Sequence, residues 1–220
     1  MKIRVKICGV TTEKDAQMVA LAGADAIGLN FFPDSPRFIA DEYDARKIQA
    51  ILTPLRVLSI GLFVNPNPDD VAKMVHFVGL DGVQLHGEET PELAEKIRKA
   101  CNKRIQLWKA YRIGSDADVK NVIKEDFPCD ALLLDARVKG DARGGTGHAF
   151  DWGLLEGFPR KKPLVLAGGL KPDTVEEAIQ RVKPDAVDTA SGVESKPSVK
   201  DQEKTLAFIQ NARKAAAKIS

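Results

Sequence analysis

Short apolar segments alternate with longer amphipathic segments along the whole chain. The short segments are rich in Val, Ile and Leu and are bounded by turn-forming residues, which is typical of buried β-strands. They cover residues 2–8, 25–31, 57–64, 82–85, 104–109, 131–135, 163–167 and 185–189. Between them, apolar residues recur at helical spacing and predict helices over 12–22, 41–52, 68–78, 90–101, 116–125, 151–157, 172–182 and 200–217.

Several of these predicted helices have recognisable starts. Thr11 or Thr12 is placed to cap the first helix, because a hydroxyl there can accept a hydrogen bond from a free backbone N–H group. Pro91 and Pro172 fall at first helical positions, where proline is favoured because its missing N–H would have no partner in any case.

The strict alternation of eight strands with eight helices predicts a parallel sheet of the α/β class. Right-handed crossovers and short loops would close such a sheet into a (β/α)8 TIM barrel. A doubly wound open sheet is the structural alternative, although it usually has fewer strands and binds its ligand at a single switch point. No linker or low-complexity tract divides the chain, so residues 1–220 are predicted to form a single domain.

Composition narrows the class of protein further. Hydrophobic residues make up 44% of the chain, and the formal net charge of +2 is dispersed, which argues against a nucleic-acid partner. Cys8, Cys101 and Cys129 lack metal-ligand spacing, so we expect reduced thiols, no metal and a cytoplasmic location. The N-terminus lacks the apolar region of a signal peptide, and no stretch is long and apolar enough to predict a membrane span.

Two strand ends carry residues suited to proton transfer. In a barrel the chemistry takes place at the C-terminal ends of the strands, and there the first strand delivers Cys8 and the sixth delivers Asp135. A thiol and a carboxylate facing one small molecule can remove a proton from carbon and supply one to oxygen. The alternatives are an ordinary buried cysteine, and an aspartate in a structural ion pair with Arg137 or Lys139.

Three further side chains are expected near these two. Lys6 precedes Cys8 by two residues and therefore shares its strand face, where a cation would lower the pKa of the thiol. Arg37 follows the second strand and could bind a substrate carboxylate with its bidentate fork, or lie solvated at the surface. His86 follows the fourth strand and could bind substrate or satisfy its own loop.

Glycine-bearing turns follow the sixth, seventh and eighth predicted strands. Glycine lets a backbone approach an anion closely, and barrels frequently bind phosphate at the last two of these loops. We therefore expect a substrate with a phosphate monoester, the alternative being that the glycines only make tight turns. The candidate phosphate-binding residues are Gly145, Gly147, Gly168, Gly169, Ser191 and Gly192.

As a set, the segments around these residues resemble the phosphoribosylanthranilate isomerase family of tryptophan biosynthesis. The motifs fall in order across nearly the whole chain, and together they are highly specific. They are Lys6-Ile7-Cys8-Gly9, Gly82-Val83-Gln84-Leu85-His86-Gly87, Leu133-Leu134-Asp135, Gly144-Gly145-Thr146-Gly147 with Phe150-Asp151-Trp152, Leu166-Ala167-Gly168-Gly169-Leu170, and Asp188-Thr189-Ala190-Ser191-Gly192-Val193-Glu194.

The resemblance implies an Amadori rearrangement of N-(5-phosphoribosyl)anthranilate to 1-(2-carboxyphenylamino)-1-deoxyribulose 5-phosphate. By this analogy Asp135 is the general acid, Cys8 is the general base, and Arg37 engages the anthranilate carboxylate. The glycine loops match a phosphate cradle, and Asp188 matches a position near the substrate, so Lys6, His86 and Asp188 are expected to line the substrate site. No cofactor or metal is implied, and the protein is expected to act on a small phosphosugar as a monomer or homodimer.

Three other functions share parts of this pattern. The aldose–ketose isomerase of histidine biosynthesis is similar in fold, but it has an aspartate where this chain has Cys8. Indole-glycerol phosphate synthase relies on lysine-rich strand ends that are not assembled in this sequence. A non-catalytic phosphosugar-binding barrel would keep the glycine loops and would need neither Cys8 nor Asp135.

Overall fold

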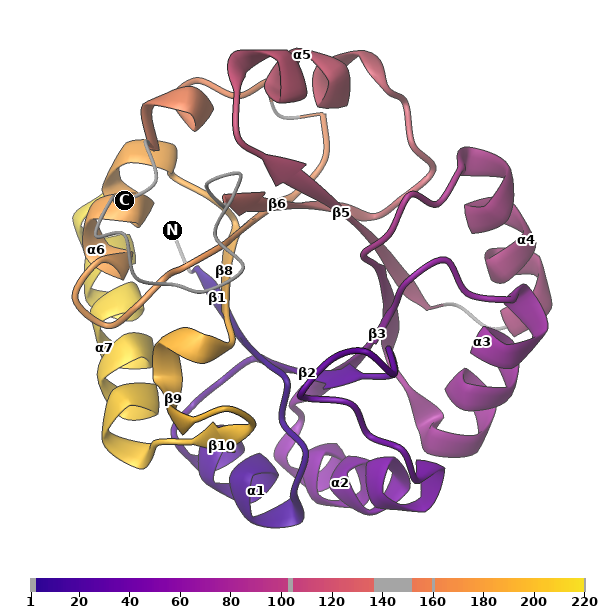
Figure 1. The fold of residues 1–220 in the computed structure, drawn as a ribbon. Coiled ribbons are helices and arrows are strands. Elements are labelled where there is room, and N and C mark those ends of the chain that lie inside the picture. Colours follow the sequence, from indigo (N-terminus) through magenta and orange to yellow (C-terminus); the bar gives the residue numbers. More distant parts are fainter. Residues whose placement is uncertain (1–2, 103–104, 137–151, 160, 220) are drawn as a thin grey trace.

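Eight parallel strands close into a barrel in the computed structural model, which describes residues 3–102, 105–136, 152–159 and 161–219 (Figure 1). The ring closes because β1 pairs with β2 on one side and with β8 on the other. The predicted (β/α)8 barrel is confirmed, and the open sheet is wrong. The strands are β1 (Arg4–Cys8), β2 (Ala26–Asn30), β3 (Leu58–Phe63), β4 (Gly82–Leu85), β5 (Gln106–Ile113), β6 (Ala131–Ala136), β7 (Leu164–Ala167) and β8 (Ala186–Thr189).

Helices form the outer ring around this barrel (Figure 1). They are α1 (Glu13–Leu21), α2 (Glu42–Leu55), α3 (Pro68–Met74) with the π-helical turn η1 (Val75–Gly79), α4 (Pro91–Cys101), α5 (Asp116–Lys124), the 3₁₀ turn η2 (Trp152–Leu155), α6 (Val175–Val182) and α7 (Gln202–Lys218). In the part of the chain that the structure describes, none of these helices is both long and apolar enough to cross a bilayer.

Two of the predicted helix starts are confirmed and one is wrong. The Thr12 hydroxyl accepts a hydrogen bond from the Asp15 N–H and begins α1, and Pro91 is at the start of α4. Pro172 lies instead in a turn before α6, because the Thr174 hydroxyl accepts a hydrogen bond from the Lys171 N–H group. This local bond delays the start of the helix to Val175.

Additional short elements follow β8. The chain forms a 3₁₀ turn, η3 (Ser191–Val193), and then a hairpin of β9 (Glu194–Lys196) and β10 (Val199–Lys200) before α7 begins. Strands this short carry no alternating pattern that a sequence window can detect, so this hairpin was not predicted.

The side chains of the barrel strands divide into two cores. Outward-facing residues such as Ile7 and Leu134 pack against the helices, while a separate cluster fills the barrel interior. Since strand side chains alternate, Asp135 shares the inward face with Leu133, and Asp188 shares it with Ala186. The interior cluster consists of Ala26, Ile60, Trp108, Ala110, Ala131, Leu133, Val165, Ala167 and Ala186.

Candidate active site

Cys8 lies at the tip of β1, directly above Lys6 on the inward face of the strand. Both residues are almost fully buried, at 7% and 1% exposure. Cys8 is in register with Gly28 of β2, and a Cβ at Gly28 would lie 2.7 Å from Cys8 Sγ and 3.1 Å from Lys6 Nζ. The absence of a side chain at Gly28 therefore makes the space that the thiol and the ammonium occupy.

Lys6 forms a buried ion pair with Asp188, which β8 places opposite it in register. The Lys6 Nζ–Asp188 Oδ2 distance is 3.0 Å. Burial lowers the pKa of Lys6, but the negative charges of Asp188 and Cys8 raise it by more, so the ammonium stays charged. Asp188 Oδ1 is buried and accepts no hydrogen bond from the residues that the structure describes, which leaves it available to a substrate hydroxyl.

The thiol of Cys8 has a raised pKa. Burial is the largest cause, because it disfavours the thiolate, and Asp188 raises the pKa further. Lys6 and Lys200 act in the opposite direction. Lys6 thus lowers the pKa of the thiol, as predicted, but desolvation of the thiolate outweighs this effect.

His86 and Asp135 face each other across the top of the barrel. Nε2 of the buried Gln84 lies 2.8 Å from His86 Nδ1. His86 Nε2 lies 3.6 Å from Asp135 Oδ2, and Asp135 is only 2% exposed. Nδ1 of His86 thus contacts Gln84, while Nε2 faces the site. The alternative partners of Asp135, Arg137 and Lys139, lie outside the described residues.

These groups converge on one centre. Burial raises the pKa of Asp188, while the charges of Lys6 and His86 lower it and that of Asp135 raises it. Each of these charges is close enough to act on the same carboxyl group, although the residues come from β1, the end of β4, β6 and β8. The structure therefore brings together the acid and base candidates and the three expected substrate-lining residues.

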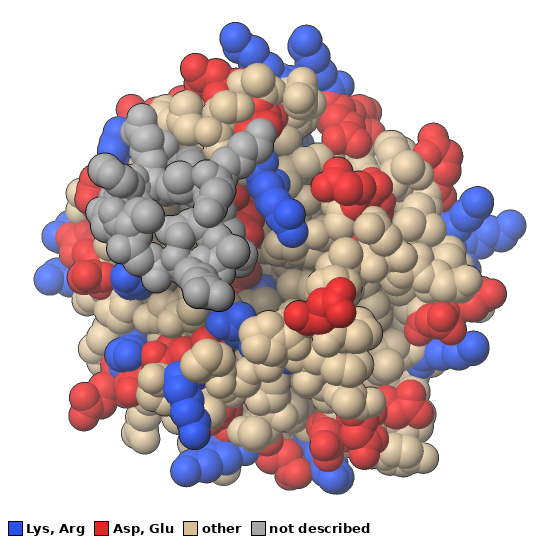
Figure 2. All heavy atoms as spheres, in the orientation of Figure 1, with Lys and Arg blue, Asp and Glu red and all other residues tan. Residues whose placement is uncertain are grey.

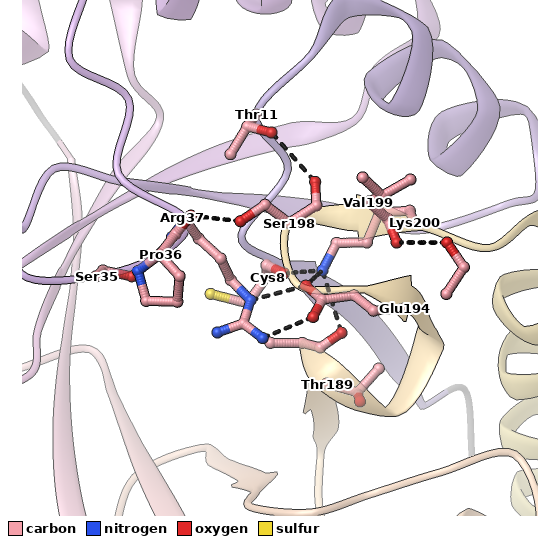
Figure 3. A network of polar contacts seen from close by, with 12 residues as sticks. Cys8, Thr11, Ser35, Pro36, Arg37, Thr189, Glu194, Ser198, Val199 and Lys200 are labelled. Atoms are coloured by element: carbon pink, nitrogen blue, oxygen red, sulfur yellow. Dashed lines mark hydrogen bonds and ion pairs between the residues drawn. The ribbon is translucent and has the colours of Figure 1, made fainter.

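Arg37 follows β2 and lies over Gly9, at the end of β1. Gly9 has a φ of 72°, and a Cβ there would overlap Arg37 Cδ, so only glycine lets the two loops pack this closely. Arg37 donates to Glu194 from Nε (2.7 Å) and from Nη2 (2.6 Å), and its side chain is 20% exposed (Figure 3). The solvated alternative for Arg37 is thus wrong.

The glycine loops after β7 and β8 adjoin each other. Gly192 packs so tightly on the Leu170 carbonyl that any Cβ would overlap it, and the Thr189 hydroxyl donates to the same carbonyl at 2.7 Å. Gly168 and Gly169 have φ values of 92° and 66°, a conformation that glycine adopts without strain. Ser191 is exposed at the start of η3. Gly145 and Gly147 lie outside the described residues.

A hollow opens at the centre of the barrel face, with basic and acidic side chains at its edge (Figure 2). A cleft of about 470 Å³ lies to one side, lined by His86, by Ala110 and Arg112 of β5 and by Asn121 of α5. Small-molecule sites are usually concave and of this order of size, so this end of the barrel has room for a ligand.

Several residues of the site were missed at the level of sequence. Gly28 had a signal, since a glycine inside a strand indicates a close approach by another group. Glu194 fell within a quoted motif, but nothing indicated its pairing with Arg37. Lys200 had no signal, because its burial depends on the unpredicted hairpin.

The fold and the arrangement of its strand ends define a (β/α)8-barrel enzyme, a class whose chemistry takes place where these residues gather. Residues 5–211 match the family described as N-(5'-phosphoribosyl)anthranilate (PRA) isomerase. The Thermotoga petrophila enzyme named N-(5'-phosphoribosyl)anthranilate isomerase is 43% identical over 96% of this chain and 98% of its own. The chain belongs to the phosphoribosylanthranilate isomerase family.

Solved structures are similar over nearly the full length. The crystal structure of phosphoribosyl anthranilate isomerase from Thermotoga maritima has a TM-score of 0.85 and 42% identity, covering 96% of this chain and 99% of that one. A second structure, in complex with reduced 1-(o-carboxyphenylamino)-1-deoxyribulose 5-phosphate, has a TM-score of 0.82 and 39% identity, with the same coverage.

The close approach of Gly28 to the thiol leads to a first prediction. Gly28→Ala is expected to lower kcat by about 10- to 100-fold, because the new methyl group must displace Cys8 Sγ and Lys6 Nζ from the site. Steady-state kinetics and a thermal melt of the same preparation test this. A folded variant with wild-type kcat would contradict the assigned position of the thiol.

Proposed function

We propose that Asp135 and Cys8 carry the two proton transfers of this isomerase. The enzyme converts N-(5-phosphoribosyl)anthranilate to 1-(2-carboxyphenylamino)-1-deoxyribulose 5-phosphate in tryptophan biosynthesis. The supporting observation is that a thiol and a carboxyl group are both buried at the same end of the barrel, Cys8 beside the Lys6–Asp188 ion pair and Asp135 beside His86.

Asp135 acts first, as the general acid. Its proton passes to the furanose ring oxygen, the bond from C1 to that oxygen breaks, and the nitrogen lone pair forms a Schiff base. Asp135 is only 2% exposed, so this proton transfer takes place away from bulk water. The His86 ring, whose Nε2 lies 3.6 Å from Asp135 Oδ2, would stabilise the carboxylate that remains.

Cys8 acts second, as the general base. The thiolate removes the proton from C2, the electron pair forms the C1–C2 double bond, and the Schiff base becomes an enolamine. This species tautomerises to the ketone when C1 gains a proton and the C2 hydroxyl loses one. Lys6 stabilises the thiolate from the adjacent inward position. These reaction steps require proton transfer only, so we propose no cofactor and no metal.

The substrate's anionic ends are proposed to lie on opposite sides of this pair. The loops at Gly168, Gly169, Ser191 and Gly192, together with Gly145 and Gly147, would bind the phosphate through backbone N–H groups. Arg37 would bind the anthranilate carboxylate. Asp188 would accept a hydrogen bond from a sugar hydroxyl through Oδ1.

Removal of the Arg37 guanidinium tests the carboxylate contact. Arg37→Met is expected to raise KM about 10- to 100-fold with a smaller effect on kcat, because hydrogen bonds between charged groups contribute about 1.5–3 kcal/mol. Arg46→Met, which removes an arginine on α2 whose guanidinium lies over the ring of Phe77, is the matched control. An unchanged KM in Arg37→Met would place the carboxylate elsewhere.

The location and assembly of the protein are also proposals. No disulfide joins Cys8, Cys101 or Cys129, all three of which lie in the described part of the chain, and this supports a reducing compartment such as the cytoplasm. We propose a monomer or a homodimer that needs no nucleic-acid partner. Light scattering of the purified protein distinguishes the two assemblies.

A further inference from the structure

The β9–β10 hairpin contacts the loops after β1 and β2. Its turn residue Ser198 has a φ of 67°, and the Ser198 carbonyl accepts a hydrogen bond from the Thr11 hydroxyl at 3.3 Å. The Ser198 hydroxyl donates to the carbonyl of Pro36, the residue before Arg37 (Figure 3). The hairpin therefore joins the loop that follows the proposed base to the loop that carries the proposed carboxylate-binding arginine.

Lys200 ends this hairpin, and its side chain is buried, at 0% exposure. Its ammonium donates to the Cys8 carbonyl (2.7 Å), to Glu194 Oε1 (2.8 Å) and to the Ala190 carbonyl (3.1 Å). These three contacts use all three N–H donors of a lysine. The Lys200 backbone N–H also donates to Asp15 Oδ2 of α1 at 3.1 Å. One buried side chain thus fixes the main chain at Cys8 and at the end of β8.

Glu194 transmits this constraint to Arg37. Its side chain is only 5% exposed, and it receives hydrogen bonds from Lys200 and from the Nε–Nη2 edge of Arg37 (Figure 3). A guanidinium has five N–H donors, so this pairing leaves the Nη1–Nη2 edge for a second carboxylate. The orientation of that free edge is set by Glu194.

The charges of this cluster favour an anionic ligand. Burial raises the pKa of Glu194, but hydrogen bonds from Arg37 and Lys200 lower it by more, so the carboxylate stays ionised. Burial lowers the pKa of Lys200 and its ion pair with Glu194 opposes this; with its three donors all used, the ammonium form makes the cluster of Arg37, Lys200 and Glu194 carry one uncompensated positive charge. A substrate carboxylate at the free edge of Arg37 would neutralise it.

We propose that Glu194 and Lys200 are positioning residues of the isomerase reaction: Lys200 holds the backbone of the base and, through Glu194, orients the guanidinium that receives the substrate carboxylate. The inference rests on the proposed roles of Cys8 and Arg37. It goes further because two residues outside the barrel strands, Glu194 and Lys200, would set the distance between the base and the bound substrate carboxylate.

Two ligands separate positioning from general structural support. One is reduced 1-(o-carboxyphenylamino)-1-deoxyribulose 5-phosphate, and the other is its phenylamino analogue, which lacks the carboxylate. Calorimetry with Glu194→Gln is expected to show about tenfold weaker binding of the first ligand and nearly unchanged binding of the second. Lys196→Met, on the exposed side of the same hairpin, is the control and should bind both ligands as the wild type does.

Lys200→Met adds a second measurement, the pH dependence of kcat/KM, which should not change if Lys200 only supports the fold. Lys200 lowers the pKa of Cys8, so its removal raises that pKa and shifts the acidic limb of the kcat/KM profile to higher pH. Lys200→Arg, which keeps the charge, is expected to restore the limb towards its wild-type position. A folded Lys200→Met variant with an unchanged profile would overturn the part of the proposal that concerns the base.

The outcomes distinguish this inference from the proposed function on which it rests. Equal losses for both ligands in Glu194→Gln, or no loss for either, would overturn the inference. Selective loss for the carboxylated ligand in Arg37→Met but not in Glu194→Gln would overturn the inference alone. Unchanged binding in Arg37→Met would overturn the carboxylate contact itself, and the inference with it.

Discussion

Cys8→Ser is expected to lower kcat by about 10²- to 10⁴-fold, the range that a positioned general base contributes. A serine hydroxyl fits the space beside Gly28 but does not ionise at the pH at which a thiol does, so the C2 proton loses its acceptor. The rate of loss of substrate fluorescence measures this. Cys129→Ser removes a thiol of the outer core and should leave kcat unchanged.

The same base determines the pH dependence. Because the thiolate is the active form, kcat/KM should increase as the pH rises through the pKa of Cys8. At pH values below that pKa, kcat/KM should be low. Burial raises that pKa, so the limb should lie above the pH at which an exposed thiol titrates. A folded Cys8→Ser variant with wild-type kcat would show that another group removes the proton.

Asp135→Asn is expected to cause a loss of the same order, about 10²- to 10⁴-fold in kcat. The amide keeps the size of the carboxyl group but has no proton to give to the ring oxygen, so the furanose ring does not open. Stopped-flow fluorescence with saturating substrate measures the step. Asp126→Asn, which alters an exposed carboxylate, is the control. Retention of wild-type kcat in Asp135→Asn would exclude this residue as the acid.

The barrel and its inward-facing residues were accessible from the sequence because both depend on regular patterns. Alternation along β1 predicted that Lys6 and Cys8 share a face, and the structure places both beside Gly28. The rule that chemistry gathers at C-terminal strand ends selected Asp135, whereas Asp188 was expected only from the family resemblance. Their convergence follows from closure of the barrel, which sets residues far apart in the chain side by side.

The remaining features depend on tertiary contacts that no local pattern encodes. The pairing of Arg37 with Glu194 needs the hairpin after β8, whose strands are too short to detect. The burial of Lys200 follows from that hairpin, and the net pKa of Cys8 follows from desolvation that only the packed structure reveals. Pro172 shows the same limit, because one hydroxyl contact delays its helix.

The fluorescence of phosphoribosylanthranilate, generated in place from anthranilate and phosphoribosyl pyrophosphate, gives the sharpest test of the acid and the base. Wild type, Cys8→Ser, Asp135→Asn and the double variant would be compared. The account predicts rapid loss of substrate with wild type, a deep fall in each single variant, and a double variant whose defect is far smaller than the product of the two. Wild-type turnover surviving in both single variants would contradict the assignment of the acid and the base.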